Sequence, residues 1–391
     1  MTGLDRLLAD PTRLAALAGQ RVGLLVNPTS VTASLEHAID ALQRCGVKIA
    51  RLFGPEHGVR ADAQDMEVVT ETVDSISGVA VISLYGATLE SLTPSQAHLD
   101  GLDVVICDIQ DIGARYYTYV YTIGLMMKAC GQAGIKVIVL DRPNPITGLH
   151  VEGNVVLPEF ASFVGMQPLA TRHAMTCGEL AHFFVRFGGW PCELEVIAMR
   201  GWRRAMWFDQ TGLPWVMPSP NMPTLETATV YVGQCLLEGT NASEGRGTTR
   251  PFELFGAPYV DAVALQQFLV ALDLPGVAWR LAAFRPGFQK HAQTTCRGLQ
   301  MHVTERDQFD SLATGYAVLA GLLKVCPGDF AWREEAYEFV ADRLAIDLLL
   351  GDEQVRHALE AGEHPVALSR RPSAARTQFD QRRQECLLYE Q

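Results

Sequence analysis

The predicted fold is decided by the stretch RVGLLVNPTSVTASLEHAIDALQRCGVKIARLFG, residues 21–54. A strand is expected at residues 21–26, because residues 22–26 form a continuous apolar run, which is typical of a strand buried on both faces. Residues 32–46 carry apolar side chains at helical spacing, and this pattern ends at Gly46. A second apolar strand follows at residues 47–54. A strand, a crossover helix and another buried strand predict a parallel pair.

The same alternation continues over the first 240 residues or so. Further strands are expected at 78–86, 102–110, 135–145 and 193–202, and helices at 121–134 and 175–189. Continuous apolar strands with helices between them predict a parallel sheet covered on both faces. We therefore expect an α/β protein with a Rossmann-like, doubly wound parallel sheet.

A second, smaller α/β domain is expected after this sheet. A proline-rich stretch at 213–224 leads into a helix-like segment at 225–240 and a loop rich in Gly, Thr and Pro at 241–258. Helical patterns return at 309–326 and 336–351, and the polar, basic tail after residue 365 predicts a terminal surface helix. We predict a Rossmann-like catalytic domain over residues 1–255 and a C-terminal α/β domain over residues 256–391 that closes a cleft.

Composition narrows the classes of partner. The 391 residues carry a formal net charge of -12, which argues against nucleic acid and anionic membrane surfaces. No apolar run is long enough to cross a bilayer. The nine cysteines form no CxxC pair and suggest free thiols in a reducing compartment. The N-terminus lacks a secretory signal pattern, so we expect a cytoplasmic protein, although a chain trimmed of an export signal would look the same.

Polar side chains follow the predicted strands where each one ends. Because parallel sheets bind ligands beyond the carboxyl ends of their strands, these side chains predict a site at one edge. A single Asp or Asn at such a position usually serves a local turn, but the repetition favours a functional cluster. In strand order the cluster comprises Asn27; Glu56 and His57; Tyr85; Asp108, Gln110, Asp111 and Arg115; then Asp141, Arg142 and Asn144.

Glu56 lies in a tight turn, GPEHG, directly after the second strand. Gly54, Pro55 and Gly58 should shape this turn and hold the carboxyl group at the mouth of a cleft. A carboxyl group against apolar surroundings has a raised pKa and can donate a proton near neutral pH. The alternative is that Glu56 caps the next segment or pairs with Arg60.

Other candidate chemistries are weaker. His57, Asp62, Asp65 and Asp108 fit no clear metal geometry, so we expect no metal. Cys107 lies within an apolar strand, and GxSxG, GxGxxG and P-loop patterns are absent, which disfavours nucleophilic serine or cysteine chemistry and any nucleotide cofactor. Sugar stacking or hydrogen bonding could involve the tyrosines of CDIQDIGARYYTYVYT, namely Tyr116, Tyr117, Tyr119 and Tyr121, although some of them should simply pack in the core.

Six motifs together resemble the family known as domain of unknown function 1343, whose members include exo-β-N-acetylmuramidases of the NamZ type. In chain order they are LFGPEHGVRADAQD, DIQDIGARYYTYVYT, LDRPNPITG, VEGN, PSPNMPT and EGTNASEGRGTTRPFE. The resemblance runs from about residue 20 to the C-terminus. It implies a glycosidase that releases N-acetylmuramic acid from non-reducing ends of peptidoglycan fragments. With the expected cytoplasmic location, these would be fragments taken up for wall recycling. The resemblance also implies an active-site cleft between two domains.

The resemblance makes Glu56 the expected catalytic acid. The candidates for the second catalytic carboxylate are Asp108, Asp111, Glu152 and Glu244. The substrate's own acetamido group is an alternative nucleophile. Arg115, Arg142 or Arg246 could bind the lactyl carboxylate. The remaining predicted substrate-binding residues are Asn27, His57, Arg60, Gln110, Tyr117, Tyr119, Asn144, Asn221, Asn241, Ser243 and Thr248. The expected partner is a small-molecule substrate, a muramic-acid-containing saccharide or muropeptide. The sequence predicts no particular oligomeric state. A glycosidase acting on N-acetylglucosamine, or an inactive sugar-binding protein, are the alternatives.

Overall fold

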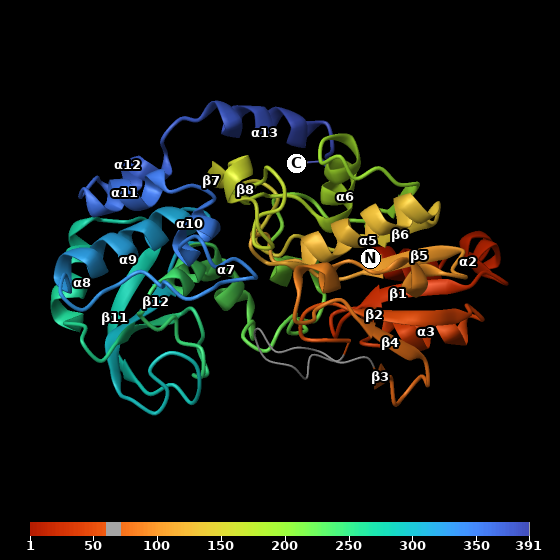
Figure 1. Ribbon diagram of the computed structural model, residues 1–391, viewed down its shortest axis with the longest axis horizontal. Helices are drawn as coiled ribbons and strands as arrows, with labels where there is room; N and C mark the ends of the chain where they lie inside the picture. Colours follow the sequence, from red (N-terminus) through yellow and green to blue (C-terminus); the bar gives the residue numbers. More distant parts are fainter. Residues whose placement is uncertain (60–71, 391) are drawn as a thin grey trace.

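A seven-stranded sheet forms the N-terminal part of the computed structural model, which describes residues 1–59 and 72–390 (Figure 1). All neighbouring strands are parallel except β3, which runs antiparallel to β4. The predicted doubly wound α/β sheet is therefore confirmed. The order across the sheet is β3 (Thr72–Val73), β4 (Ala80–Ser83), β2 (Ile49–Gly54), β1 (Val22–Val26), β5 (Val104–Asp108), β6 (Lys136–Leu140) and β9 (Leu194–Ile197).

Apolar side chains of the strands pack into two separate hydrophobic cores. Leu24 and Ile106 belong to the core shared with α1 (Gly3–Leu8), α2 (Pro11–Leu17) and α3 (Ala38–Arg44). Leu25 and Val105 belong to the core shared with α4 (Gln96–Leu99), α5 (Tyr119–Ala133) and α6 (Cys177–Arg186). Successive strand residues point to opposite faces, which is why both faces are apolar and both are covered.

The second unit is built on helix α9 (Ser311–Val325) and a three-stranded antiparallel sheet. Its strands lie in the order β10 (Leu254–Ala257), β12 (Cys296–Val303) and β11 (Val277–Phe284), and α8 (Ala262–Ala271) packs on them. The unit is completed by α10 (Ala345–Leu350), α11 (Gln354–Glu360) and α12 (Pro365–Ser369). The smaller elements are β7 (Glu152–Val155), β8 (Ala170–Arg172), η1 (Leu89–Leu92), η2 (Pro158–Phe160), η3 (Phe208–Thr211) and η4 (Cys235–Gly239).

The chain enters this second unit at α7 (Leu225–Gln234), which packs against α9. Two glycines permit the close crossing, because a Cβ added at Gly315 would lie only 2.4 Å from the carbonyl oxygen of Gly233. The predicted domain boundary at residue 255 falls inside β10, well after the chain has joined the second unit.

Two predicted helices are shorter than expected. The helix expected at 32–46 covers only Ala38–Arg44, because Leu35 has a positive φ of 69° and the preceding residues form a turn. The helix expected at 336–351 covers only Ala345–Leu350. Glu338 and Phe339 have φ values of 46° and 69°, and Tyr337 and Val340 pair across the resulting tight turn.

The C-terminal segment returns to the N-terminal unit. Figure 1 shows α13 (Ala374–Gln384) stretched across the top of the molecule between the two units. Arg376 donates to the carbonyl oxygens of Val151 and Gly153 at 2.6 and 2.9 Å, and the Tyr389 hydroxyl donates to Asp141. The predicted terminal helix is present, but it joins two parts of the fold. Of the helices that the structure describes, none is long and apolar enough to span a bilayer.

Candidate active site

A small cavity of about 40 Å³ lies where the two units meet, and both contribute its walls. The first unit supplies the turn after β2 and the start of α5; the second supplies α7, η4 and two loops. The lining residues are Glu56, His57, Tyr116, Tyr117, Thr118, Tyr119, Val164, Ser219, Asn221, Met222, Tyr231, Glu238, Arg246, Phe252, Tyr337 and Glu338.

Glu56 reaches this cavity through a tight turn. The amide of Gly58 donates to the carbonyl oxygen of Pro55 at 2.9 Å, and His57 and Gly58 both have positive φ. The Thr118 hydroxyl donates to Glu56 Oε2 at 3.0 Å, and the Tyr119 hydroxyl donates to the Glu56 carbonyl oxygen at 3.3 Å. The first turn of α5 therefore holds both the side chain and the backbone of Glu56.

Two more carboxylates reach the cavity from the second unit. Glu238 pairs with Arg246 at 2.5 Å and accepts a hydrogen bond from the Tyr337 hydroxyl at 2.7 Å. Glu338 accepts one from the Tyr85 hydroxyl at 3.4 Å. The cavity thus combines three carboxyl groups with the guanidinium of Arg246.

Glu244 stands behind Arg246 and does not line the cavity. Its carboxylate lies 3.6 Å from Arg246 Nε and 3.0 Å from Lys290 Nζ. Burial by itself would raise the pKa of Glu244, but the two cations together hold that pKa below its usual value. Glu244 therefore remains an anion that fixes the Arg246 side chain.

One wall of the cavity is aromatic. Tyr117 meets Tyr119 and Tyr231 edge-on, with ring centroids 5.0 and 5.8 Å apart. Burial raises the pKa of Tyr117 well above its ordinary value, so its hydroxyl stays protonated. That hydroxyl makes no hydrogen bond of good geometry within residues 1–59 and 72–390, although Ser219 lies close by. The hydroxyl of neighbouring Tyr116, in contrast, donates to the Val232 carbonyl oxygen.

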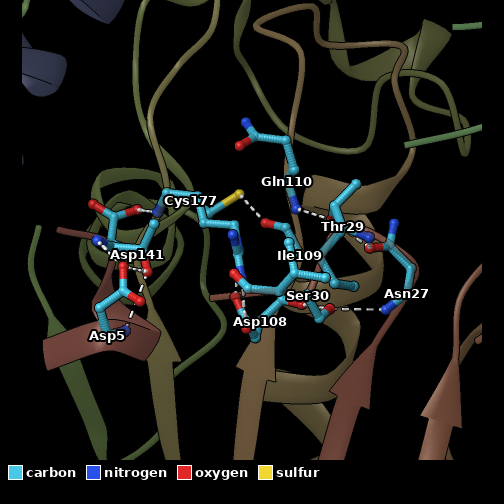
Figure 2. Close-up of polar contacts among 12 residues, drawn as sticks. Asp5, Asn27, Thr29, Ser30, Asp108, Ile109, Gln110, Asp141 and Cys177 are labelled. Carbon is cyan, nitrogen blue, oxygen red and sulfur yellow. Dashed lines mark hydrogen bonds and ion pairs between the residues drawn. The ribbon is translucent and has the colours of Figure 1, made fainter. Parts of the chain in front are cut away.

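The polar cluster predicted at the strand ends is bonded to itself (Figure 2). Arg142 donates to both carboxylate oxygens of Asp108, at 2.5 and 2.8 Å, and the Gln110 amide donates to the Thr29 hydroxyl at 3.0 Å. The Asn27 side-chain oxygen accepts from the Thr29 amide at 3.0 Å. Internal hydrogen bonds occupy much of the edge between β1 and β5, where doubly wound sheets usually bind ligands, and Thr29, Gln110 and Arg142 line a separate hollow of only about 20 Å³ there. None of these residues lines the cavity.

Asp111 and Asn144 likewise serve the fold. The Gly113 amide donates to Asp111 at 2.7 Å, and Asn144 donates to the Met175 carbonyl oxygen at 2.9 Å. Neither residue lines the cavity. Their position after a strand predicted polarity correctly, but local backbone groups use that polarity.

Arg115 and Glu152 hold the two units together. The fully buried Arg115 donates to the carbonyl oxygens of Asn154 at 2.7 Å and Leu349 at 2.9 Å. Glu152 pairs with Arg172 and accepts from the Leu312 amide at 3.0 Å. Arg115 therefore has no access to a substrate carboxylate, and Glu152 is not placed for attack on a sugar in the cavity.

The predicted residues of the EGTNASEGRGTT segment divide into two groups. Arg246 lines the cavity, whereas Asn241, Ser243 and Thr248 shape the loop that presents it. Asn241 accepts from the Ala331 amide at 3.1 Å, Ser243 accepts from the Gly245 amide at 3.1 Å, and Thr248 donates to the Gly245 carbonyl oxygen at 2.6 Å. Arg60, Asp62 and Asp65 lie outside the described residues.

Of the predicted site residues, the structure brings together six in one cavity: Glu56, His57, Tyr117, Tyr119, Asn221 and Arg246. Sequence reasoning missed Thr118, Ser219, Tyr337 and Glu338, and it did not assign Glu238 a role. The sequence could have indicated Glu238 as a site residue, since it is the first residue of the EGTNASEGRG motif. Nothing in the sequence pointed to Tyr337 and Glu338 as site residues, because their segment carries a helical pattern. In the described parts of the chain, no three His, Cys, Asp or Glu side chains are grouped to hold a metal ion.

Comparison with known proteins agrees with this architecture. Residues 22–226 match the family model described as "Exo-beta-N-acetylmuramidase NamZ, N-terminal", and residues 229–389 match its C-terminal counterpart. The chain belongs to the NamZ family. The two family models meet where α7 begins, which is also where the chain enters the second unit.

Similar proteins of the NamZ family cover the whole chain. The peptidoglycan beta-N-acetylmuramidase NamZ of Bacillus subtilis (strain 168) is 43% identical over 389 residues, covering 99% of this chain and 91% of that protein. One crystal structure of a DUF1343 family protein from Bacteroides fragilis superimposes with a TM-score of 0.86 at 33% identity and covers 100% of this chain and 98% of that one. A second from the same species gives 0.77 at 27% identity, covering 100% and 99%.

Proposed function

We propose that this protein is an exo-acting N-acetylmuramidase that releases single N-acetylmuramic acid residues from the non-reducing ends of peptidoglycan fragments. Full-length similarity to the Bacillus subtilis enzyme supports this activity. The observation that carries the proposal is the position of Glu56, which lies with two other carboxyl groups and an aromatic wall in one cavity between the two units. Aromatic side chains and hydrogen-bonding groups of this kind suit a pyranose ring.

Glu56 is our proposed general acid. Glycoside hydrolysis needs a carboxylic acid to protonate the leaving oxygen and, in most enzymes, a second carboxylate on the other side of the bond. The sequence candidates for the second role, Asp108, Asp111, Glu152 and Glu244, all lie outside the cavity. We assign this role to Glu238, because its ion pair with Arg246 and its hydrogen bond from Tyr337 stabilise the charged form.

Arg246 is our proposed ligand for the lactyl carboxylate of the substrate. Three arginines were candidates for this contact, but Arg115 donates to backbone carbonyls and Arg142 pairs with Asp108. Arg246 lines the cavity, with its guanidinium 5.2 Å from the centroid of the Phe252 ring. A planar guanidinium can pair with Glu238 through one edge and still offer other N–H donors to a carboxylate.

We further propose that the enzyme acts in the cytoplasm on fragments taken up for wall recycling. All nine cysteines are unpaired thiols, seven of them buried, which suits a reducing compartment. Fractionation of the source cells, followed by immunodetection, tests this placement. Detection mainly in the extracellular or periplasmic fraction would contradict it.

Activity is tested with a chromogenic N-acetylmuramic acid glycoside. Wild type should hydrolyse this substrate, and Glu56→Gln should lower kcat by about 10²–10⁴-fold, the usual contribution of a general acid. Glu363→Gln is the matched control, since it alters a half-exposed carboxylate that pairs with Arg371 and does not line the cavity. Wild-type turnover by Glu56→Gln would remove Glu56 from its role. Preference for the matching N-acetylglucosamine glycoside would defeat the assigned substrate.

A further inference from the structure

Three consecutive residues at the start of α5 face the cavity in different ways. Tyr117 contributes an aromatic edge, Thr118 donates to the Glu56 carboxyl group, and Tyr119 donates to the Glu56 backbone. We infer that Thr118 is a positioning residue for catalysis, one that orients the Glu56 carboxyl group through the hydrogen bond to Oε2. This inference rests on the proposed role of Glu56.

The geometry of Thr118 argues against a purely local role. Thr118 occupies the N-cap position of α5, where a Thr hydroxyl normally accepts a hydrogen bond from an amide of the first turn. Here the backbone of Thr118 is already helical, with φ -63° and ψ -13°, and its side chain makes no capping bond. The hydroxyl instead donates to a side chain 62 residues away in sequence. The usual stabilisation by an N-cap is given up for the contact with Glu56.

The support around this contact is rigid. The Tyr119 hydroxyl donates to Glu56 O at 3.3 Å and to Pro218 O at 2.6 Å, so it ties the GPEHG turn to the loop before α7. Thr118 and Glu56 are both more than nine-tenths buried. The helix that carries Thr118 is 15 residues long and packs on the parallel sheet. Catalytic groups held from regular elements keep their geometry better than groups held by loops alone.

The hydrogen bond has a stereochemical consequence for acid catalysis. Because Thr118 donates to Oε2, this contact favours Oε1 as the oxygen that carries the proton of the neutral carboxyl group. The contact therefore selects which oxygen delivers the proton and fixes the plane of the carboxyl group. Loss of the hydroxyl should lower turnover more than it weakens substrate binding, since a misdirected acid acts only on the chemical step.

The decisive experiment compares three variants on the chromogenic N-acetylmuramic acid glycoside. Thr118→Val removes the hydroxyl and nearly preserves the side-chain shape, and Thr118→Ser keeps the hydroxyl. Thr118→Ala also removes the hydroxyl and replaces Thr118→Val if that variant does not fold. Thr122→Val is the matched control, because the Thr122 hydroxyl, one helical turn later, donates to the carbonyl oxygen of Thr118 and Thr122 does not line the cavity.

We expect Thr118→Val to lower kcat about tenfold or more with a smaller change in KM, as for loss of a hydrogen bond to an ionisable group. The limb of the kcat–pH profile that reports Glu56 should move to higher pH, because a hydroxyl donor favours the carboxylate. Thr118→Ser should restore both values and Thr122→Val should match wild type. Among the described residues, the other titratable or charged groups that line the cavity with Glu56 are unchanged in every variant: His57, Tyr116, Tyr117, Tyr119, Tyr231, Glu238, Arg246, Tyr337 and Glu338.

Wild-type kcat and an unmoved pH profile in Thr118→Val, or in Thr118→Ala, would overturn the inference. Failure of Thr118→Ser to restore kcat would do the same. Glu56→Gln separates this failure from that of the proposed function. If Glu56→Gln is inactive and Thr118→Val is normal, only the role of Thr118 is wrong. If Glu56→Gln is fully active, the assignment of the acid itself is wrong.

Discussion

Tyr117→Phe offers a prediction in which activity and stability should move apart. The Tyr117 side chain is buried and faces the cavity, yet its hydroxyl has no hydrogen-bond partner of good geometry in the described chain. An unpaired buried hydroxyl costs about 1–3 kcal/mol of stability. We attribute its presence to a hydrogen bond that Tyr117 donates to the bound sugar.

The magnitude follows from this cost. Removing the hydroxyl should lose about 1.4 kcal/mol of transition-state binding, which is about a tenfold loss of kcat/KM. The free energy of unfolding should stay the same or rise by up to about 1 kcal/mol, because the variant no longer buries an unpaired donor. A purely structural tyrosine would show the opposite pattern.

Two neighbouring tyrosines serve as controls. Tyr116→Phe breaks a bond to the Val232 carbonyl oxygen and should lose about 1 kcal/mol of stability. The Tyr121 hydroxyl also has no partner of good geometry among the described residues, but Tyr121 lies outside the cavity, so Tyr121→Phe should retain full activity. The assay is kcat/KM on the chromogenic glycoside, with urea unfolding of each variant. Unchanged kcat/KM together with lowered stability in Tyr117→Phe would refute the reasoning.

Three further predictions concern charged groups. Arg246→Gln should lower the ratio of kcat/KM for the N-acetylmuramic acid glycoside to that for the N-acetylglucosamine glycoside about tenfold or more, as for loss of a charged hydrogen bond; an unchanged ratio would exclude Arg246 as the lactyl ligand. Glu238→Gln should lower kcat by about 100-fold or more while the protein stays folded by circular dichroism; wild-type turnover would leave the second carboxylate unassigned. Burial raises the pKa of Asp141 from 3.8 to about 6, so the folded chain keeps a proton that the unfolded chain loses between these values. Urea titration of wild type and Asp141→Asn measures the difference between their free energies of unfolding. This difference should fall by up to about 3 kcal/mol as the pH rises from 4 to 6 and stay level above that. A difference that does not change with pH would contradict the raised pKa.

The sheet could be predicted from sequence because its signal is local. Each buried strand is a continuous apolar run, and each crossover helix has its own periodicity, so the stretch at residues 21–54 contains the parallel pairing in full. The turn at Glu56 was also readable, since Gly54, Pro55 and Gly58 leave the chain few alternatives.

The role of the polar residues at the strand ends could not be predicted from the sequence. Asp108, Gln110 and Arg142 carry the chemistry of a ligand site, but Arg142 pairs with Asp108 and the Gln110 side chain donates to backbone carbonyl oxygens. Whether a polar group binds a ligand or a neighbour depends on three-dimensional packing, which spacing along the chain does not show.

The helix predicted over residues 336–351 was wrong at Tyr337 and Glu338 for a related reason. Its residues favour a helix locally, whereas the structure holds two of them at positive φ. A long-range contact, the hydrogen bond from Tyr337 to Glu238, stabilises the turn. Tertiary contacts of this kind override local propensity, and here they place two residues in the wall of the cavity.

The central claim is that the cavity around Glu56 is the site of glycosidic cleavage. The most direct test is a crystal structure of Glu56→Gln with a bound disaccharide that carries N-acetylmuramic acid at its non-reducing end. We predict the glycosidic oxygen within about 3.2 Å of the residue 56 side chain, and the lactyl carboxylate on Arg246. A sugar bound elsewhere, for example in the groove between β7 and α13, with the cavity around residue 56 left empty, would contradict the account.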